Sequence, residues 1–166
     1  MILYILRHGI AEDRVKGRPD TERALTDEGR ARTLRVAKGL RSLGIRYDAL
    51  LTSPLIRAVQ TAAIVSEVFE DRAVPEKLDA LAVGVAPANS VAALKPFLRM
   101  DEVIVVGHEP GLSELAATLL TGSARGLGIV LMKAGCIALE LGSYGSRGSA
   151  QLLWMMTPGQ LRLIGK

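Results

Sequence analysis

Residues 1–9 read MILYILRHG, an apolar run that ends in an arginine, a histidine and a glycine. A short aliphatic run that empties into a loop is typical of a buried parallel strand. Residues 103–109 repeat this arrangement as VIVVGHE, and the chain contains no histidine besides His8 and His108. Because ligands of open α/β sheets bind at the carboxyl ends of the strands, we expect both imidazoles at one sheet edge.

The rest of the chain alternates strand-like and helix-like segments. Strands are expected at residues 2–6, 49–52, 103–106, 136–141 and 151–156, with a further extended piece from Val74-Pro75. Helices are expected at residues 27–43, 54–69, 89–98 and 112–120, and residues 78–88 read as a loop. A turn over residues 142–149 joins the last two strands as a hairpin. This order predicts an α/β fold with a mostly parallel sheet and an antiparallel portion.

Capping residues set the expected helix starts. Thr26 is a plausible cap for the first helix. Ser53 reads as the cap of the second, with Pro54 at its first helical position. Glu109 is expected to cap the start of the helix at 112–120, where negative charge is stabilising. The buried face of the first helix is expected to contain Ala31, Leu34, Ala37 and Leu40.

The chain has 166 residues, of which 49% are hydrophobic and 23% are charged. This length and composition predict one soluble globular domain over residues 1–166. No apolar stretch has transmembrane length, and Arg7 ends the first apolar run too early for a signal peptide. We therefore expect a cytoplasmic protein without membrane contact. Cys136 is the only cysteine, which excludes an internal disulfide and favours a buried, inert thiol.

The formal net charge is +4, and the basic excess lies in residues 14–46. The cations of that stretch are Arg14, Lys16, Arg18, Arg23, Arg30, Arg32, Arg35, Lys38, Arg41 and Arg46. They read either as a solvated helix face or as a rim that attracts a phosphorylated or acidic partner. Aromatic residues make up only 4% of the chain, so a nucleic-acid partner is not expected.

Two arginines are expected beside the two histidines. Arg7 precedes His8, and Arg57 follows the predicted start of the second helix, whose side chains lean back toward the helix start. That start lies at the carboxyl end of the strand at 49–52. Guanidinium groups bind two phosphate oxygens at once, and helix amino termini favour anions. The convergence of Arg7, His8, Arg57 and His108 therefore indicates an anion site with a nucleophile or base in it.

Several other chemistries do not fit the sequence. Residues 108–112 read HEPGL, which lacks the second histidine of a zinc-binding H-E-x-x-H motif. Cys136 has Gly142 where a cysteine phosphatase needs an arginine. The chain also has no G-x-x-x-x-G-K-[ST] phosphate loop and no G-x-S-x-G elbow.

The combined motifs resemble the histidine phosphatase superfamily, which includes the phosphoglycerate mutases. The resemblance is carried by Arg7-His8-Gly9, by Ser53-Pro54 with Arg57 and Gln60-Thr61, and by Gly107-His108. It spans residues 2 to about 120 in family order. The short chain and residues 23–29, RALTDEG, are most similar to the SixA-type phosphohistidine phosphatases.

This resemblance implies a phosphoglycerate mutase-like, three-layer α/β sandwich with helices on both faces of the sheet. It also implies that His8 is the nucleophile and becomes phosphorylated. Arg7, Arg57 and His108 would then bind the transferred phosphoryl group, with no metal and no cofactor. These roles suit phosphoryl transfer, in which catalysis is mostly positioning and cationic stabilisation. His8 must be neutral at its attacking nitrogen, and a hydrogen bond from its other ring nitrogen to a backbone carbonyl would fix that tautomer.

The general acid of many relatives has one candidate here. Residues 78–84 read LDALAVG, so Asp79 could protonate a leaving group, or it could be a solvated loop carboxylate. Without a dependable acid an alkoxide leaves poorly, whereas an imidazole is easier to expel. This favours phosphohistidine over a sugar phosphate as the substrate.

We therefore expect a metal-independent phosphatase of signal transduction that acts on phosphohistidine in proteins. Its partner would be a phosphorylated protein such as a histidine phosphotransfer domain, and the enzyme would be a monomer. Two alternatives stay open. The same site could be that of a broad small-molecule phosphomonoesterase, or it could belong to a non-catalytic phosphate-binding module that tolerates loss of His8.

Overall fold

The computed structural model describes residues 1–70, 74–142 and 147–166. Its strands are β1 (Ile2–Arg7), β2 (Ala49–Thr52), β3 (Glu76–Lys77), β4 (Glu102–Gly107), β5 (Cys136–Glu140) and β6 (Gln151–Met156). Its α-helices are α1 (Asp27–Ser42), α2 (Ile56–Phe69), α3 (Pro87–Leu94), α4 (Gly111–Thr121) and α5 (Pro158–Ile164). Short 3-10 helices are η1 (Asp20–Glu22), η2 (Asp79–Leu81) and η3 (Lys95–Phe97).

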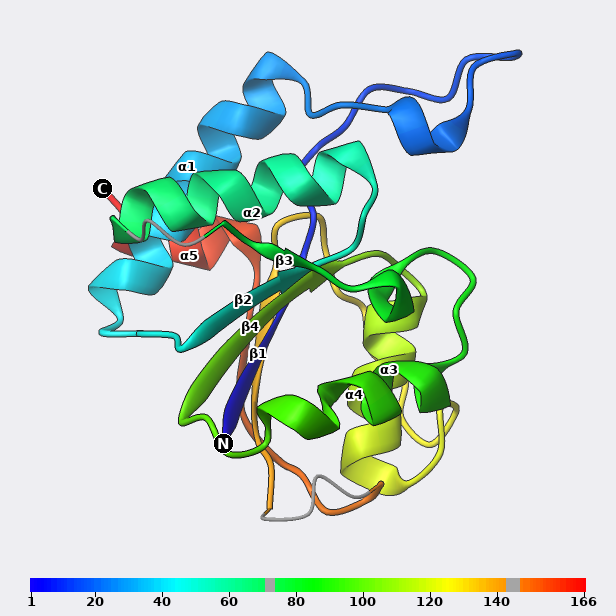
Figure 1. Ribbon diagram of the computed structural model, residues 1–166. Coiled ribbons are helices and arrows are strands. Elements are labelled where there is room, and N and C mark those ends of the chain that lie inside the picture. The colour runs from blue at the N-terminus through cyan, green and yellow to red at the C-terminus, as the bar shows by residue number, and fades with distance from the viewer. Residues whose placement is uncertain (71–73, 143–146) are drawn as a thin grey trace.

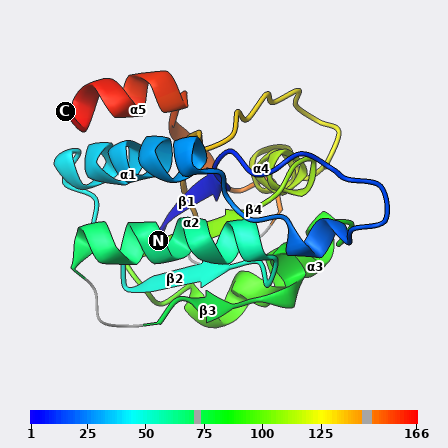
Figure 2. The same cartoon turned by 90° about the horizontal axis from the view of Figure 1, so that it is seen from above.

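The strands form one sheet in the order β3-β2-β4-β1-β5-β6. β3, β2, β4 and β1 pair in parallel, whereas β5 pairs antiparallel with both β1 and β6. Helices α1, α2 and α5 cover one face of the sheet, and α3 and α4 cover the other (Figures 1 and 2). The predicted three-layer α/β architecture is therefore confirmed, with its antiparallel portion at the β5–β6 hairpin. Part of the predicted turn, residues 143–146, lies outside the described residues.

The first apolar run is continuous because both faces of β1 are buried. Side chains alternate along a strand. Accordingly Leu3 and Ile5 join the core beneath α3 and α4, while Tyr4 and Leu6 join the core beneath α1 and α2. Each fully buried aliphatic side chain contributes about 1.5–3 kcal/mol to folding. This burial fixes the strand that delivers His8.

The buried face of α1 differs from the prediction. Thr26 caps the helix as expected, by accepting a hydrogen bond from the Gly29 amide. Ala37 and Leu40 are buried as predicted, whereas Ala31 and Leu34 are exposed. The other buried residues of the helix are Gly29, Thr33, Val36 and Gly39. A Cβ on Gly29 would lie 1.9 Å from the Ile10 carbonyl oxygen. Because glycine has no side chain, this face of α1 can pack directly against neighbouring backbone. The prediction from the spacing of apolar residues misses such positions, since glycine is not counted as apolar there.

The start of α2 also differs. The helix begins at Ile56 with Leu55 at the capping position, so Ser53 is not its cap and Pro54 is not its first residue. The hydroxyl of Ser53 does accept a hydrogen bond from the Leu55 amide at 3.3 Å, but its nearer partner is His108. The predicted cap is thus used to connect the strand end to the second imidazole.

Two further helices depart from the sequence expectations. The sequence predicts a helix at residues 89–98, whereas α3 begins at Pro87 and ends at Leu94. Proline at the first helical position favours this earlier start. α5 was not predicted. It begins with a capping box between Thr157 and Gln160, and it buries Leu161 fully against α1. Among the described residues, no helix is long and apolar enough to cross a membrane.

Candidate functional site

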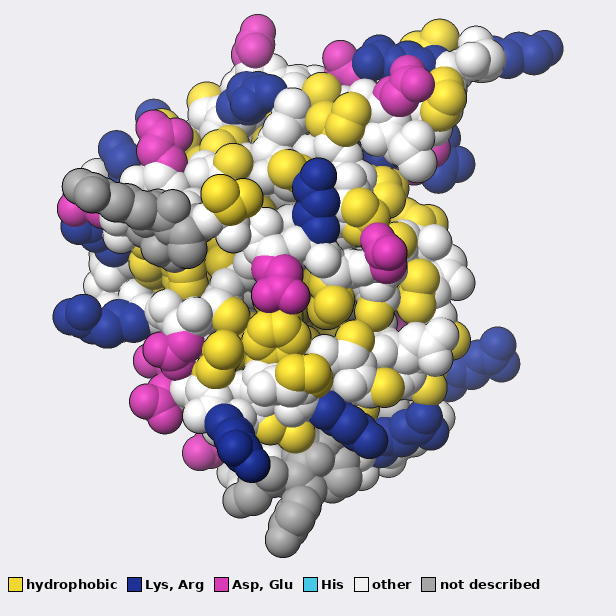
Figure 3. Space-filling model, viewed as in Figure 1, with side chains coloured by type: hydrophobic (Ala, Val, Ile, Leu, Met, Phe, Trp, Pro, Cys, Tyr) yellow, Lys and Arg dark blue, Asp and Glu magenta, His cyan; other side chains and the backbone are white. Residues whose placement is uncertain are grey.

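The parallel register of β1 and β4 brings the two histidines together. Arg7 is level with Gly107, and the His8 amide donates a hydrogen bond to the Gly107 carbonyl at 3.1 Å. The imidazole centroids of His8 and His108 lie 4.9 Å apart, with the ring planes inclined by 52°. Both side chains are buried, and Figure 3 shows no histidine on the face it presents. The prediction that both strand ends meet at one edge is confirmed.

Arg57 reaches the same place from the first turn of α2. It is only 3% exposed, and its Nε donates to Nε2 of His8 at 3.3 Å. Arg7 donates from Nη1 to the carbonyl oxygen of Leu131 at 2.8 Å, which fixes the direction of its side chain. Its buried Nε has no partner among the described residues. The structure therefore offers two permanent cations next to the two imidazoles.

Polar contacts tie the loop after β1 to α2. Thr61 Oγ1 accepts from the Gly9 amide at 3.1 Å and donates to the Arg57 carbonyl at 2.7 Å. Gln60 Oε1 accepts from the Leu25 amide at 2.7 Å. Thr61 thus holds the loop after His8, and Gln60 holds the segment before α1, against the helix that carries Arg57.

The tautomer of His8 follows from its hydrogen bonds. Nδ1 lies 2.7 Å from the carbonyl oxygen of Gly9, and because a carbonyl only accepts, Nδ1 carries the proton. Nε2 therefore carries no proton, and its lone pair accepts the hydrogen bond from Arg57 Nε. Burial, followed by the proximity of His108, Arg57 and Arg7, lowers the pKa of His8 to about 3. The ring is therefore neutral at physiological pH.

His108 is held by Ser53. Its Nε2 lies 2.8 Å from Ser53 Oγ, and its buried Nδ1 has no partner among the described residues. Burial and then the Arg57 charge lower the pKa of His108 to about 4. The imidazole is therefore neutral in this state, and a bound phosphoryl dianion would favour its protonation. The unpartnered Nδ1 can form a hydrogen bond with a bound ligand.

Asp20, which the sequence reading did not single out, lies at the site. Its Oδ2 accepts from Arg57 Nη2 at 2.9 Å, and its backbone carbonyl accepts from Arg57 Nη1 at 2.7 Å. Its Oδ1 accepts from Arg23 at 2.7 Å and from Arg14 at 3.0 Å. Hydrogen bonds from Arg23 and Arg57 lower the pKa of Asp20 to about 2. The sequence gives no signal that distinguishes Asp20, because residues 12–22 contain several acids and no apolar periodicity marks one of them.

The cations of the basic stretch differ in how exposed they are and in whether they contact the site. The cations of α1, among them Arg30, Arg35 and Lys38, are exposed and form a solvated helix face. Arg23, by contrast, has a side chain that is only 14% exposed and pairs with Asp20. Residues 12–18 form the projecting segment at the upper right of Figure 1, and Figure 3 shows exposed Lys and Arg side chains there.

Asp79 does not join the cluster through any contact. It begins η2 and is exposed, and within the described residues no hydrogen bond or ion pair connects it to the four predicted site residues. Its neighbours Ala80, Leu81 and Ala82 do line a small pocket together with His108, so η2 passes the site. Its role as a general acid remains a prediction.

Three further predictions concern Glu109, a metal site and Cys136. The capping position of α4 is Pro110 and not Glu109, but the Glu109 carboxylate still accepts a hydrogen bond from the first-turn amide of Ser113 at 3.1 Å. Among residues 1–70, 74–142 and 147–166, no three His, Cys, Asp or Glu side chains are grouped closely enough to hold a metal ion. Cys136 is fully buried, and burial raises the pKa of its thiol.

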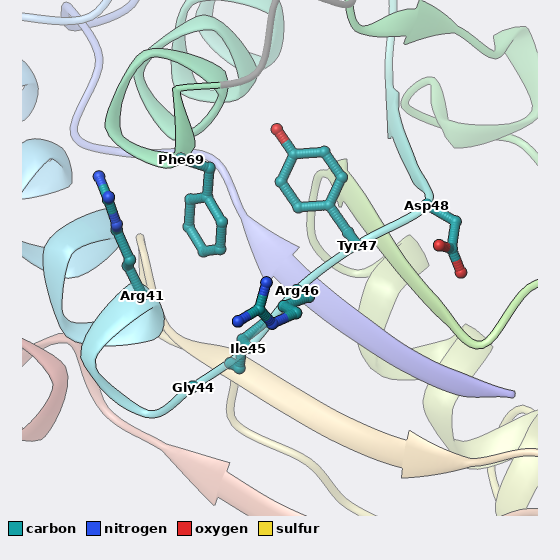
Figure 4. A pocket seen from close by; sticks show the side chains of 7 residues that line it. All are labelled: Arg41, Gly44, Ile45, Arg46, Tyr47, Asp48 and Phe69. Atoms are coloured by element: carbon teal, nitrogen blue, oxygen red, sulfur yellow. The ribbon is translucent and has the colours of Figure 1, made fainter.

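A pocket of about 610 Å³ lies elsewhere, lined by Arg41, Arg46 and the adjacent rings of Tyr47 and Phe69 (Figure 4). β2 runs from this pocket to Ser53, so the pocket and the two imidazoles lie at opposite ends of the strand. None of the four predicted site residues lines it, and we assign it no part in the reaction.

Comparison with known proteins places the chain among histidine phosphatases. The sequence profile of the histidine phosphatase superfamily (branch 1) matches residues 3–82. An uncharacterized protein of Picosynechococcus sp. (strain ATCC 27264 / PCC 7002 / PR-6) is 39% identical over 149 residues, covering 86% of this chain and 87% of the relative. Phosphohistidine phosphatase SixA of Escherichia coli (strain K12) is 24% identical over 169 residues, covering 98% of each chain.

The fold has a solved counterpart. A structure of the protein histidine phosphatase SixA complexed with tungstate matches with a TM-score of 0.86 and 24% sequence identity, over 97% of this chain and 99% of the other. The three-layer sandwich described above is therefore the SixA fold.

Proposed function

Because the chain belongs to the histidine phosphatase superfamily, we propose that it is a phosphatase that hydrolyses phosphohistidine in proteins through a phosphorylated His8. One observation carries the proposal. The proton of His8 is fixed on Nδ1 by the Gly9 carbonyl, and the lone pair of Nε2 is aimed at the cationic side of the site. A neutral, oriented imidazole beside guanidinium groups is suited to accept a phosphoryl group.

The reaction then has two steps. His8 Nε2 attacks phosphorus, the P–N bond of the substrate breaks, and its electron pair stays on the departing imidazole. Water next attacks the phosphorus on His8, which releases inorganic phosphate and restores the neutral ring. Arg7 and Arg57 stabilise charge on the equatorial oxygens in both steps, and a protonated His108 would add to them.

The charges of the site support phosphohistidine over phosphate esters. Without a bound phosphoryl group the pKa values of His8 and His108 are about 3 and 4, so neither imidazole holds a second proton near neutral pH, and Asp20 is ionised. An alkoxide needs a proton from the enzyme to leave, whereas the imidazole of a ring-protonated phosphohistidine leaves as a neutral molecule. The physiological partner we propose is accordingly a phosphorylated protein such as a histidine phosphotransfer domain.

The test compares substrates and the His8→Ala variant with chelator present throughout. Wild-type protein should turn over a phosphohistidine peptide faster than a phosphoserine peptide or a sugar phosphate. His8→Ala should lose turnover while retaining part of its affinity for inorganic phosphate. The trapped phosphoenzyme should be labile to acid and stable to base, as a P–N bond requires.

Each contrary outcome identifies an alternative. Faster turnover of the sugar phosphate would reject phosphohistidine specificity and favour a small-molecule phosphomonoesterase. Phosphate binding without turnover in the wild-type protein would indicate a binding module. Undiminished turnover in His8→Ala would reject the covalent route.

A further inference from the structure

The guanidinium of Arg57 is held at both of its ends. Its Nε faces Nε2 of His8, and its terminal nitrogens Nη1 and Nη2 bind the carbonyl and the carboxylate of Asp20. Within the described residues, these are the hydrogen-bond partners of its side chain. Asp20 comes from η1, which is 37 residues away in sequence. The direction of this cation is therefore set by a residue outside α2.

The two edges of a guanidinium offer separate pairs of donors. The terminal edge is formed by Nη1 and Nη2, and the side edge is formed by Nε and Nη2. Asp20 occupies the terminal edge, and the side edge faces His8. On that side edge, the second N–H of Nη2 has no partner among the described residues, and the Nε–H bound to His8 Nε2 is released once Nε2 carries a phosphoryl group. Both donors can then meet the oxygens of that group.

We propose that Asp20 is a positioning residue, which holds the terminal edge of Arg57 so that its side edge faces the phosphoryl group accepted by His8. This inference rests on the proposed function, because it assigns to Arg57 a particular set of donors in that reaction. Bidentate contacts of this kind depend on orientation, and a misplacement of about 1 Å can cost about 100-fold in rate.

Hydrogen bonds hold the segment around Asp20 in position. Arg23 donates to Asp20 Oδ1 and also, from Nε, to the Glu12 carbonyl at 2.7 Å. Ala11 and Leu25 form an antiparallel bridge, and Leu25 is in turn held by Gln60 of α2. Residues 11–25 are thus closed into a loop that is anchored on the same helix as Arg57.

A proton-donating role for Asp20 does not fit these contacts. Its carboxylate accepts from three guanidinium groups, which favour the ionised form, and its side chain is only 31% exposed. An acid held in this way gives no proton to a leaving group near neutral pH. Its effect on the reaction must therefore pass through the arginines it binds.

The experiment compares Asp20→Ala and Asp20→Asn with a matched control, Glu22→Gln. Glu22 lies on the same short helix but is exposed, and its ion pair is with Arg18 at 3.8 Å. With a phosphohistidine peptide, kcat should fall about 10- to 100-fold in Asp20→Ala and less in Asp20→Asn, which keeps an oxygen acceptor. Glu22→Gln should stay within about twofold of wild type.

A direct readout of orientation accompanies the kinetics. The Nε–H resonance of Arg57, assigned by its loss in Arg57→Lys, should be protected from exchange in the wild-type protein and should shift when inorganic phosphate is added. In Asp20→Ala it should lose that protection. A purely structural role for Asp20 would lower thermal stability and leave this signal unchanged in the folded fraction.

The outcomes separate this inference from the proposed function. A folded Asp20→Ala with wild-type kcat, or a loss of kcat with an unchanged Arg57 signal, overturns it. If Asp20→Ala does not fold, Asp20→Asn decides by the same two readouts. If the wild-type protein does not hydrolyse phosphohistidine, the proposed function fails. Two readouts then still decide the positioning role. The Asp20 variants should bind inorganic phosphate more weakly than wild type and should show an altered Arg57 signal, and unchanged values of both would overturn the inference.

Discussion

The two buried imidazoles should make the protein sensitive to mild acid. The pKa values of His8 and His108 are about 3 and 4 in the folded state, against about 6.5 in an unfolded chain. Between these pKa values the two histidines are protonated in the unfolded chain but neutral in the folded chain. Stability should fall as the pH drops through 6.5, and the fall should level off near the folded pKa values.

The size of the effect follows from these values. Between pH 7 and about pH 4.5, each imidazole should remove about 2.5 kcal/mol from the free energy of unfolding, so the pair removes about 5 kcal/mol. This is a large share of the stability of a typical domain. Exposed carboxylates titrate mainly below about pH 4.5, so this window isolates the imidazoles. No other histidines exist in the chain to confuse the measurement.

Urea unfolding at a series of pH values measures the effect. Single His8→Gln and His108→Gln variants should each lose about half of the pH dependence, and the double variant should be nearly flat. The slope against urea should stay constant, which shows that the unfolded state is unchanged. A wild-type change below about 1 kcal/mol, or one that persists in the double variant, would contradict the assignment of neutral buried rings.

Four further predictions concern single residues. Gly9→Ala should destabilise the fold by about 1–3 kcal/mol, as measured by urea unfolding, because the new Cβ would lie 2.3 Å from Thr33 Oγ1. Arg57→Lys should lower kcat/KM for a phosphohistidine peptide about 100-fold, since one ammonium cannot replace a planar fork; a loss below about threefold would count against bidentate binding. Asp79→Asn should leave phosphohistidine turnover within about twofold, and a larger loss would restore its role as an acid. The Cys136 thiol should resist a thiol reagent until the protein is unfolded, because burial raises its pKa; rapid labelling of native protein would contradict this.

The strand ends could be predicted from sequence because their signals are local. An apolar run followed by a loop histidine indicates a strand that delivers a side chain to the sheet edge, and both His8 and His108 follow this pattern. Parallel pairing then forces the two ends to meet. The α1 face could not be read in the same way, since its contacts depend on glycines that fit against backbone brought in from other elements.

The sequence places Arg57 correctly in the site but predicts the start of its helix wrongly. The sequence predicts Ser53 as the cap and Pro54 as the first helical residue, whereas α2 starts two residues later, at Ile56. Arg57 still reaches His8 because it remains in the first turn, where the side chain leans toward the helix start. Ser53 is consequently free to hold His108. A local pattern identified the right residues, but tertiary contacts decided what each one binds.

The role of Asp20 shows why part of the site escapes sequence reasoning. A buried site for an anion must also be stable when it is empty, and buried charge is costly unless it is paired. The imidazoles meet this requirement by being neutral, but an arginine cannot lose its charge. Arg57, which is 3% exposed, therefore needs a carboxylate, and residues 12–22 contain several acids. Which of them turns inward depends on how the loop closes on α2, and that closure is a tertiary property.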